Sequence, residues 1–532
     1  MPDVVVIGAG HNGLVTACYL ARAGLEVEVV ERDTVVGGAV STVERFPGYR
    51  VDRGSSAHVM IRHTGIVEEL DLASYGLVYD DLDPWGFAPF WTPAGEQVAI
   101  TFWVDLDRTC ASIAAVCGAA DAEAYHRFVT DWGRRNEHVF AAFAGEPAPA
   151  RIGRALWRAG RGADATNSEV VRQFLGSADA LLDAHFTDER LKTALAWMGS
   201  QSGPPTHETG TADLVGWLAL LHKRAPGHPR GGSGRLSEAL AARLAADGGS
   251  LRLGDGAAAI LVQDGAVRGV RTASGDVLRA DAVVGGCHVT ETLGLLGDAL
   301  PAALQHRIGQ IKLGSGIGMV VRLGTTDLPR YPAAKDDSAY RALQLLAPDR
   351  GALRAAYGDF LAGRPPARPA ALAMTFSAFD DTIAPPGRHN VSVWGQWHPY
   401  ALADGGRWSD IARAEADRLV AEVDRAAPGF AGTVEHVHVQ SPAEIERELA
   451  LPRANVMHVD MTVESMFGLR PLPELARHRV PGVRNLYLTG ASTHPGGGVF
   501  GASGRTAASV VLADRNPRRS WWPGRVRPAR RG

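Results

Sequence analysis

Three glycines near the start of the chain form its most informative ligand-binding pattern. Gly8, Gly10 and Gly13 make a G-x-G-x-x-G directly after the apolar run of residues 3–7. In such a turn the first glycine permits the tight bend, the second lets the backbone approach a pyrophosphate, and the third lets a helix pack on the strand. Free N–H groups and the dipole of that helix favour phosphate charge. The pattern predicts a dinucleotide site.

The residues that follow supply the elements that such a site needs. A helix-like stretch covers residues 14–23, and a second strand over residues 26–30 ends in Glu31. Glu31 lies eighteen residues after Gly13, where a carboxylate would hold ribose hydroxyls. The alternative is a glycine-rich strand–helix turn without a ligand, and the flanking strand, helix and acid argue against it.

Two small-residue segments extend the predicted site beyond Glu31. They are the run 35–39, which ends Gly-Gly-Ala, and the run 51–58, which contains two serines. Their spacing resembles the FAD-binding oxidoreductases of the amine oxidase and phytoene desaturase group. The resemblance implies FAD as the cofactor. It also implies contacts from Arg32, Gly37, Gly38, Ala39, Ser55 and Ser56.

Two later segments resemble the same group. Residues 231–236 open a helix to about residue 246, and short strands follow as far as residue 284. In the group, the backbone at the position of Ala257 contacts the adenine, although valine is usual there. A strand over residues 483–489 then enters a glycine-rich loop that opens a helix to about residue 512, so its N–H groups suit the reduced flavin. Gly490, Ala491, Val499 and Phe500 are the cofactor contacts implied there; a simple strand–helix connection is the alternative.

The predicted fold class is α/β, with a discontinuous Rossmann-like FAD-binding domain and an interleaved α+β substrate domain. Strand-like runs at 316–323, 371–377, 390–397 and 433–439 predict a mixed sheet with helices on one side. The expected FAD-binding domain comprises residues 1–75, 225–300 and 480–512, and the substrate domain 76–224 and 301–479, before a basic, Trp-containing tail at 513–532.

Within the group, residues 52–65 most resemble bacterial carotenoid ketolases, which implies a long apolar polyene such as β-carotene as the substrate. Loss of a hydride from an allylic C–H to the flavin leaves a cation; water capture would give an alcohol, which a second oxidation converts into the ketone of a ketolase, whereas proton loss would give the new double bond of a desaturase. His58, Arg53 and His494 are the candidate catalytic groups, because their motifs flank the cofactor; each has an alternative as a structural residue. Lys312 is expected at the surface.

Composition limits the other possibilities. A net charge of −3 over 532 residues gives no general case for nucleic-acid binding, and four scattered cysteines predict neither a disulfide framework nor a zinc site. The pair His436 and His438 lacks partners for a metal, so a surface pair is expected. The absence of a leader or an 18-residue apolar run predicts a cytoplasmic protein.

Peripheral contact with the inner face of the cell membrane is a further hypothesis. The apolar run 214–221 could form an interfacial helix, with a buried core helix as the alternative. The tail from Arg515 carries seven arginines and two tryptophans, which suit an anionic membrane surface or a disordered tail. The rival functions are an FAD amine or alcohol oxidase on a smaller substrate and a non-catalytic lipid carrier like the Rab GDP-dissociation inhibitors.

Overall fold

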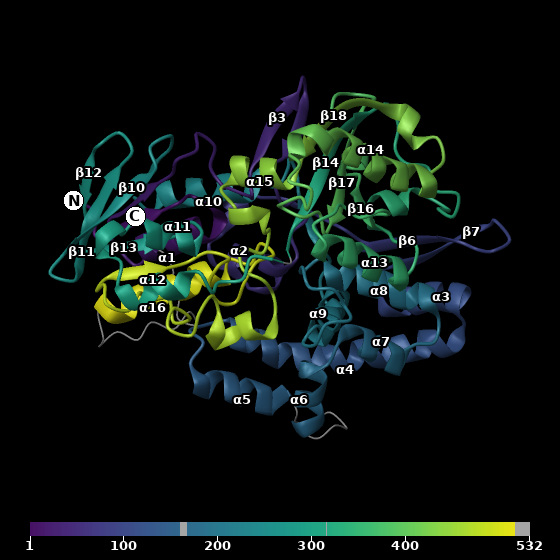
Figure 1. The fold of residues 1–532 in the computed structure, drawn as a ribbon, viewed down its shortest axis with the longest axis horizontal. Helices are drawn as coiled ribbons and strands as arrows, with labels where there is room; N and C mark the ends of the chain where they lie inside the picture. The colour runs from purple at the N-terminus through teal and green to yellow at the C-terminus, as the bar shows by residue number, and fades with distance from the viewer. Residues whose placement is uncertain (160–166, 315, 516–532) are drawn as a thin grey trace.

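The computed structural model describes residues 1–159, 167–314 and 316–515, and two sheets organise them (Figure 1). The first sheet is entirely parallel, with strand order β19-β13-β1-β2-β9. Three separate parts of the chain supply its strands, which confirms the predicted α/β class with a Rossmann-like fold. The strands are β1 (Val4–Ile7), β2 (Val27–Val30), β9 (Ser250–Arg252), β13 (Ala282–Gly285) and β19 (Leu486–Leu488).

Both faces of this sheet are covered, because its central strand is apolar on both sides. Val4 and Val6 pack with helices on one face, whereas Val5 and Ile7 pack on the other face with a small antiparallel sheet and a short helix. The first face holds α1 (His11–Arg22), α10 (Gly234–Ala246) and α16 (Ala502–Arg515). The second holds β10 (Ala257–Gln263), β11 (Ala266–Thr272), β12 (Val277–Arg279) and α11 (Val289–Gly294).

The second sheet has seven strands in the order β18-β14-β17-β16-β15-β6-β7 and is mixed, because β15 pairs in parallel with β6 and the other pairs are antiparallel. Three of its strands, β14, β17 and β18, lie within two residues of the expected runs, and β16 starts at residue 371 as expected but ends three residues early. The strands are β6 (Gly86–Trp91), β7 (Gln97–Phe102), β14 (Gly318–Thr325), β15 (Leu343–Leu346), β16 (Ala371–Met374), β17 (His389–Gln396) and β18 (Val434–Gln440).

The expectation of helices on only one side of this sheet was wrong. One face packs on α14 (Trp408–Ala426) and the other on a helical layer (Figure 1). Neighbouring residues of β15 explain the difference, since Leu345 faces the helical layer and Leu346 faces α14, and both are buried. The layer contains α3 (Leu106–Cys117), α4 (Ala119–Phe143), α7 (Ala178–His185), α8 (Glu189–Ser200), α9 (Ala212–Gly216) and α13 (Arg350–Leu361).

The apolar run 214–221 is a buried connection and not an interfacial helix. It forms the end of α9 and most of the 3-10 helix η3 (Trp217–His222), and Val215 and Leu221 are almost fully buried. Its hydrophobicity therefore serves the core, as the alternative interpretation expected. No helix among the described residues has the length and apolar character needed to cross a bilayer. The tail hypothesis concerns residues that, after Arg515, lie outside the described ranges.

The expected strand over residues 483–489 is shorter than the sequence indicated. Only Leu486–Leu488 forms β19. Val483 N–H donates to the Val480 carbonyl in a turn, and Asn485 has φ of 62°, so the extended backbone begins one residue later. The β-branched and aromatic residues that suggested a long strand are buried by this turn and by β19 together.

Candidate functional site

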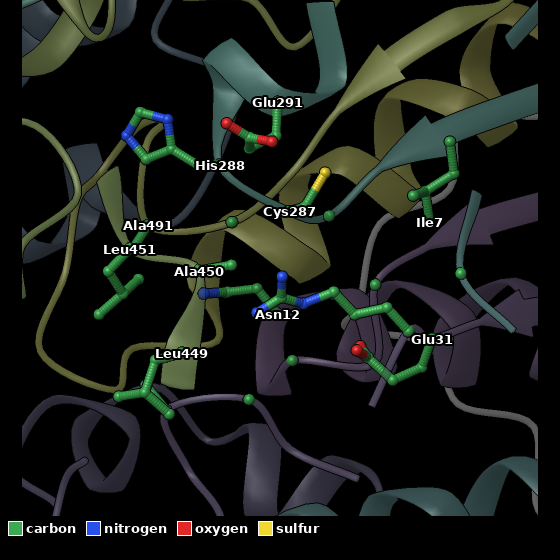
Figure 2. A pocket seen from close by; sticks show the side chains of 18 of the residues that line it. Ile7, Asn12, Glu31, Cys287, His288, Glu291, Leu449, Ala450, Leu451 and Ala491 are labelled. Atoms are coloured by element: carbon green, nitrogen blue, oxygen red, sulfur yellow. The ribbon is translucent and has the colours of Figure 1, made fainter. Parts of the chain in front are cut away.

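A groove lies at the carboxyl ends of β1, β2, β13 and β19, where an open parallel sheet binds its ligands. Its volume is about 1060 Å³, including space open to solvent. In Figure 2, Glu31 and Ile7 lie toward one side of the pocket, and Leu449, Leu451 and Ala491 lie toward the other. All three parts of the predicted FAD-binding domain contribute to the lining, together with residues near 450.

The glycines of the first turn occupy the positions that the pattern requires. Gly8 has φ of 95°, and a Cβ on Gly13 would lie 2.2 Å from the Gly8 carbonyl oxygen. Gly10 lines the groove, and a Cβ there would meet nothing within 4 Å. The first turn of α1 has no acidic residue, and Gly10 supplies no side-chain cap. Gly13 thus serves packing, whereas the backbone at Gly10 is left accessible to an anion.

Glu31 is fixed at the end of β2 by the backbone on either side of it. Its carboxylate accepts from Ala9 N–H at 2.7 Å and from Asp33 N–H at 2.9 Å. Arg32, Gly256 and Ala257 line the same part of the groove. A carboxylate held in this way can accept from ribose hydroxyls beside an adenine.

The glycine pair after β2 brings a second backbone segment against the first turn. Gly37 N–H donates to the Ala9 carbonyl at 3.0 Å, and Gly10 and Gly37 form an isolated parallel bridge. Gly37 has φ of 113°, and a Cβ there would lie 2.1 Å from the Val40 carbonyl oxygen. Gly38 and Ala39 then continue along the groove.

A buried guanidinium holds the opposite wall. Arg470 has no solvent exposure and donates to the Ala491 carbonyl at 2.8 Å. It also donates to the carbonyls of Met457, Val459, Asp460 and Ser465. Burial lowers the pKa of Arg470 to about 9. Because Ala491 lines the groove, this one side chain joins the loop after β19 to the segment 457–465.

Two histidines, His288 and His458, line the groove beside Ala491. His288 Nδ1 accepts from Thr290 N–H, so its Nε2–H donates to the His458 carbonyl at 2.9 Å. Ser492 Oγ accepts from Val289 N–H and lies 3.4 Å from His458 Nδ1. Burial lowers the pKa of His288 to about 4 and that of His458 well below its usual range. Both rings are neutral.

Ten predicted cofactor contacts line this groove. They are Gly8, Gly10, Glu31, Arg32, Gly37, Gly38, Ala39, Ala257, Gly490 and Ala491. Ser55, Ser56, Val499 and Phe500 lie outside its lining; the Ser56 hydroxyl accepts from buried Arg322 at 3.1 Å. Ser55 N–H donates to the Ala39 carbonyl at 2.9 Å, so it supports a lining residue from behind.

The three candidate catalytic residues have different surroundings. His58 is fully buried, with Nδ1 2.8 Å from the Tyr79 hydroxyl and Nε2 2.8 Å from the Ser233 hydroxyl. Arg53 pairs with Asp33 at 2.7 Å and with Glu448 at 3.0 Å. Glu448 precedes Leu449, which lines the groove, so Arg53 holds that wall in place.

His494 differs from His58 and Arg53 because one of its side-chain nitrogens, Nδ1, has no hydrogen-bond partner. Its Nε2 lies 3.4 Å from the Ala142 carbonyl, and its buried Nδ1 has no hydrogen bond. The ring packs near Phe143 and Phe467, and burial lowers its pKa to about 3. The structure does not bring His58, Arg53 and His494 into one cluster of contacts. Lys312 is exposed and pairs with Glu464, as expected.

Sequence patterns missed the part of the groove formed by residues 449–451 and His458. These residues belong to the segment between the second and third nucleotide-binding parts, and they carry no glycine motif. Cys287 and His288 had a detectable signal, because they directly follow the Gly-Gly pair at the end of β13. Among the described residues no group of three or more His, Cys, Asp or Glu side chains could hold a metal ion.

These features fit the adenine dinucleotide part of the expected FAD. An accessible helix N-terminus provides donors for a pyrophosphate, and Glu31 provides the ribose acceptor. The glycine at position 10 leaves space that a side chain would fill.

Comparison with known proteins supports this interpretation of the groove. A profile of the NAD(P)-binding Rossmann-like domain matches residues 6–70. Pyridine nucleotide-disulfide oxidoreductase domain-containing protein 2 of Mus musculus is 30% identical, over 96% of this chain and 93% of its own length. A component of the limonene dehydrogenase of Castellaniella defragrans is 27% identical over 98% and 96%. Hydroxyneurosporene desaturase of Cereibacter sphaeroides is 30% identical over 46% and 48%.

Solved structures share the fold at low sequence identity. An oxidoreductase from Methanosarcina mazei has a TM-score of 0.63 at 15% identity, covering 96% of this chain and 99% of its own. A putrescine oxidase with redesigned cofactor binding has a TM-score of 0.63 at 14% identity, covering 97% and 99%. The chain therefore has the fold of the amine oxidase group of FAD-dependent oxidoreductases.

Proposed function

The chain belongs to the family of pyridine nucleotide-disulfide oxidoreductase domain-containing protein 2, oxidoreductases of the FAD/NAD(P)-binding superfamily, and we propose that it is FAD-dependent. We further propose that it removes a hydride from an allylic C–H of an apolar isoprenoid. The specific form of the proposal is a carotenoid ketolase or desaturase. The observation that carries it is the groove where three separated segments meet, next to a cluster of aromatic and methionine side chains.

The residues that would hold FAD divide along the groove. Glu31 and the backbone at Ala257 suit the adenosine half, and the backbone at Gly10 suits the pyrophosphate. Ala39 and Ala491 continue toward the flavin half. Bound there, FAD supplies an acceptor for a hydride, which is the chemistry that the protein side chains lack.

The cluster beside the flavin-end loop suits a substrate without charge. It contains Phe500 of that loop and packs it against Phe140 and Phe143 of α4 at ring distances of 5.9 and 5.8 Å. Trp217 and four methionines, at 60, 457, 461 and 466, belong to the same cluster. Aromatic and thioether side chains adapt to an apolar chain of conjugated or isolated double bonds.

The named substrates of two relatives agree with this chemical class. The limonene dehydrogenase component and hydroxyneurosporene desaturase are named for isoprenoid compounds. The first of them matches along nearly the whole chain. We carry over only the shared class, an isoprenoid with allylic C–H bonds.

Removal of a hydride leaves a cation that either loses a proton, giving a double bond, or takes up water, giving an alcohol. His494 is the candidate that can take this proton. Its Nδ1 carries a lone pair without a partner, and its ring lies beside Phe143 and Phe467 of the apolar cluster. Both ring nitrogens of His58 are instead hydrogen-bonded, and Arg53 is held in ion pairs. In this proposal Arg53 positions the groove wall at Leu449, and His58 has a structural role between Tyr79 and Ser233.

Two measurements test the proposed function. The purified protein, yellow with FAD, is mixed without oxygen with β-carotene, limonene or cyclohexylamine, and loss of the oxidised flavin absorbance is followed. We expect bleaching by an isoprenoid alone. Expression in a bacterium that accumulates β-carotene, followed by pigment analysis, then identifies the product.

Each other outcome assigns a different function. Bleaching only by the amine would make the protein an amine oxidase. A protein that stays colourless after FAD is added would be a lipid carrier of the same fold. The variant His494→Gln keeps a hydrogen-bonding side chain without a base, so it should slow bleaching at an unchanged flavin content.

A further inference from the structure

Exposed apolar side chains gather at one corner of the molecule. Of ten large exposed apolar residues in the described ranges, four lie here: Trp157, Val171, Leu175 and Leu469. They belong to α5 (Pro149–Ala159), α6 (Asn167–Leu175) and the adjoining 3-10 helix η10 (Phe467–Leu469). Figure 1 shows α5 and α6 together beyond α4, at the lower edge of the view. Such a concentration at one corner marks an interaction surface.

Helix α5 separates an inner apolar face from an outer basic face. Ala155 and Ala159 are buried, whereas Arg154, Trp157 and Arg158 are exposed. Spacings of three and four residues place these last three on one face. The helix carries three arginines and no acidic residue. An exposed tryptophan between arginines matches the headgroup region of a bilayer, where the ring spans the boundary and the guanidinium groups meet anionic phosphates.

Helix α6 adds apolar side chains to the same corner. Val171 is 52% exposed and Leu175 is 50% exposed, one helical turn apart. Arg172, beside them, is 75% exposed and pairs with Glu169. The excess positive charge of the corner therefore comes from α5, and α6 provides side chains that can enter the apolar boundary of a lipid layer.

This corner is connected to the proposed reaction site by aromatic rings in contact. Phe174 of α6 lies 5.9 Å from Phe467, and Phe467 stacks on Phe143 at 5.3 Å. Phe143 contacts Phe500 of the flavin-end loop at 5.8 Å and His494 at 5.7 Å. The ring contacts thus form a continuous, mostly apolar connection between α6 and that loop.

We propose that the outer faces of α5 and α6 dock on an anionic lipid bilayer, from which the substrate enters. The proposal rests on the proposed function for the substrate, but the docking itself does not depend on FAD or on turnover. The proposed membrane contact lies on α5 and α6 and not on the run 214–221, which is buried. The proposed occupant of this surface is a lipid layer with acidic headgroups, because its phosphates complement the arginine face of α5 and its apolar boundary accepts the exposed pair on α6.

Vesicle flotation of the full chain with bound FAD tests the proposal. We expect flotation with vesicles of phosphatidylcholine and phosphatidylglycerol, weakened by salt, and little with phosphatidylcholine alone. Arg154→Gln with Arg158→Gln should lower the partition coefficient about 30-fold, since each basic side chain near an anionic surface contributes about 1 kcal/mol. The matched control is Arg407→Gln with Arg413→Gln, exposed arginines at α14, which should change partitioning by less than about twofold.

A second pair of variants keeps the charge and removes only the apolar contact. Val171→Ser with Leu175→Ser should weaken binding at least about 10-fold. The control Leu361→Ser, at a residue 68% exposed on α13, should not. Melting temperatures equal to the parent show that the variants fold.

Several results would overturn the proposal. They are no flotation with any vesicle, flotation of both the α5 and the α6 variants equal to the parent, or flotation lost only when residues 516–532 are deleted. The first result would favour a protein partner with an acidic surface. Flotation that persists in a protein that bleaches with no isoprenoid would refute the proposed function and leave the docking surface standing.

Discussion

Replacement of Gly10 by alanine separates ligand binding from folding at the first turn. Gly10 has φ of −64° and ψ of 158°, which alanine adopts freely, and a Cβ would meet nothing within 4 Å. Loss of backbone freedom in the unfolded chain stabilises by about 0.4–1 kcal/mol. The poorer helix N-cap costs a similar amount, roughly 0.5–1 kcal/mol. The protein without cofactor should therefore keep its unfolding free energy within about 1 kcal/mol.

Cofactor affinity should fall steeply in the same variant. A methyl group at Gly10 would occupy the space where a pyrophosphate approaches the first turn of α1. If it displaces two hydrogen bonds to charged phosphate oxygens, each contributing about 1.5–3 kcal/mol, at least about 3 kcal/mol is lost. That corresponds to a weakening of about 100-fold or more. Fluorescence titration of the apoprotein with FAD measures the affinity, and urea denaturation measures the stability.

Gly13→Ala is the matched comparison, three residues along the same helix. Its Cβ would lie 2.2 Å from the Gly8 carbonyl oxygen, so the helix must move away from the strand. Overpacking of this kind costs about 1–3 kcal/mol, and it should appear in the apoprotein. An unchanged FAD affinity in Gly10→Ala, with stability preserved, would show that the groove does not hold a pyrophosphate against Gly10, and the assignment of the site would fail.

Three further predictions concern single side chains. Glu31→Gln should weaken FAD binding at least about 10-fold in the same titration, because a neutral amide accepts more weakly from ribose hydroxyls and backbone N–H groups; unchanged affinity would remove Glu31 from the site. Arg53→Met should lower the unfolding free energy by about 3 kcal/mol in urea, since the partly buried carboxylates of Glu448 and Asp33 lose a buried partner; lost turnover at full stability would instead make Arg53 catalytic. Burial raises the pKa of Asp213 to about 7, so folding takes up a proton between about pH 4 and pH 7. The free energy of unfolding therefore falls as the pH rises through that window. Between these pH values the parent should lose up to roughly 4 kcal/mol more unfolding free energy than Asp213→Asn does, and above them the difference should not grow further. Parallel plots of unfolding free energy against pH for the two proteins would contradict the assigned burial.

The sequence was sufficient where local chemistry leaves few alternatives. The turn Gly8–Gly13 followed by an acid at the end of β2 is typical of dinucleotide binding. The structure brings both to the groove, together with the Gly-Gly pair at 37–38. Strand positions in the second sheet were also accessible, because runs of β-branched residues between turn signals predict strands whatever their order.

Other parts of the site depend on contacts that no local pattern encodes. Leu449 reaches the groove because Arg53 holds the neighbouring Glu448, which lies hundreds of residues later in the chain. His458 reaches it because Arg470 holds the segment 457–465. The run 214–221 was ambiguous for the same reason: hydrophobicity alone does not distinguish a buried helix from one on a membrane. Exposed Trp157, in a basic helix, was informative only once the inner face of α5 was known.

The position of β19 in the first sheet has a consequence for biosynthesis. β19 pairs with β13, which pairs with the central strand β1, yet it lies almost 500 residues after β1 in the chain. A ribosome adds about 5–20 residues each second, so a nascent chain waits tens of seconds before its cofactor groove can close. A nascent chain that stops short of β19 also lacks Gly490 and Ala491 of the groove lining, so it could not hold the proposed FAD.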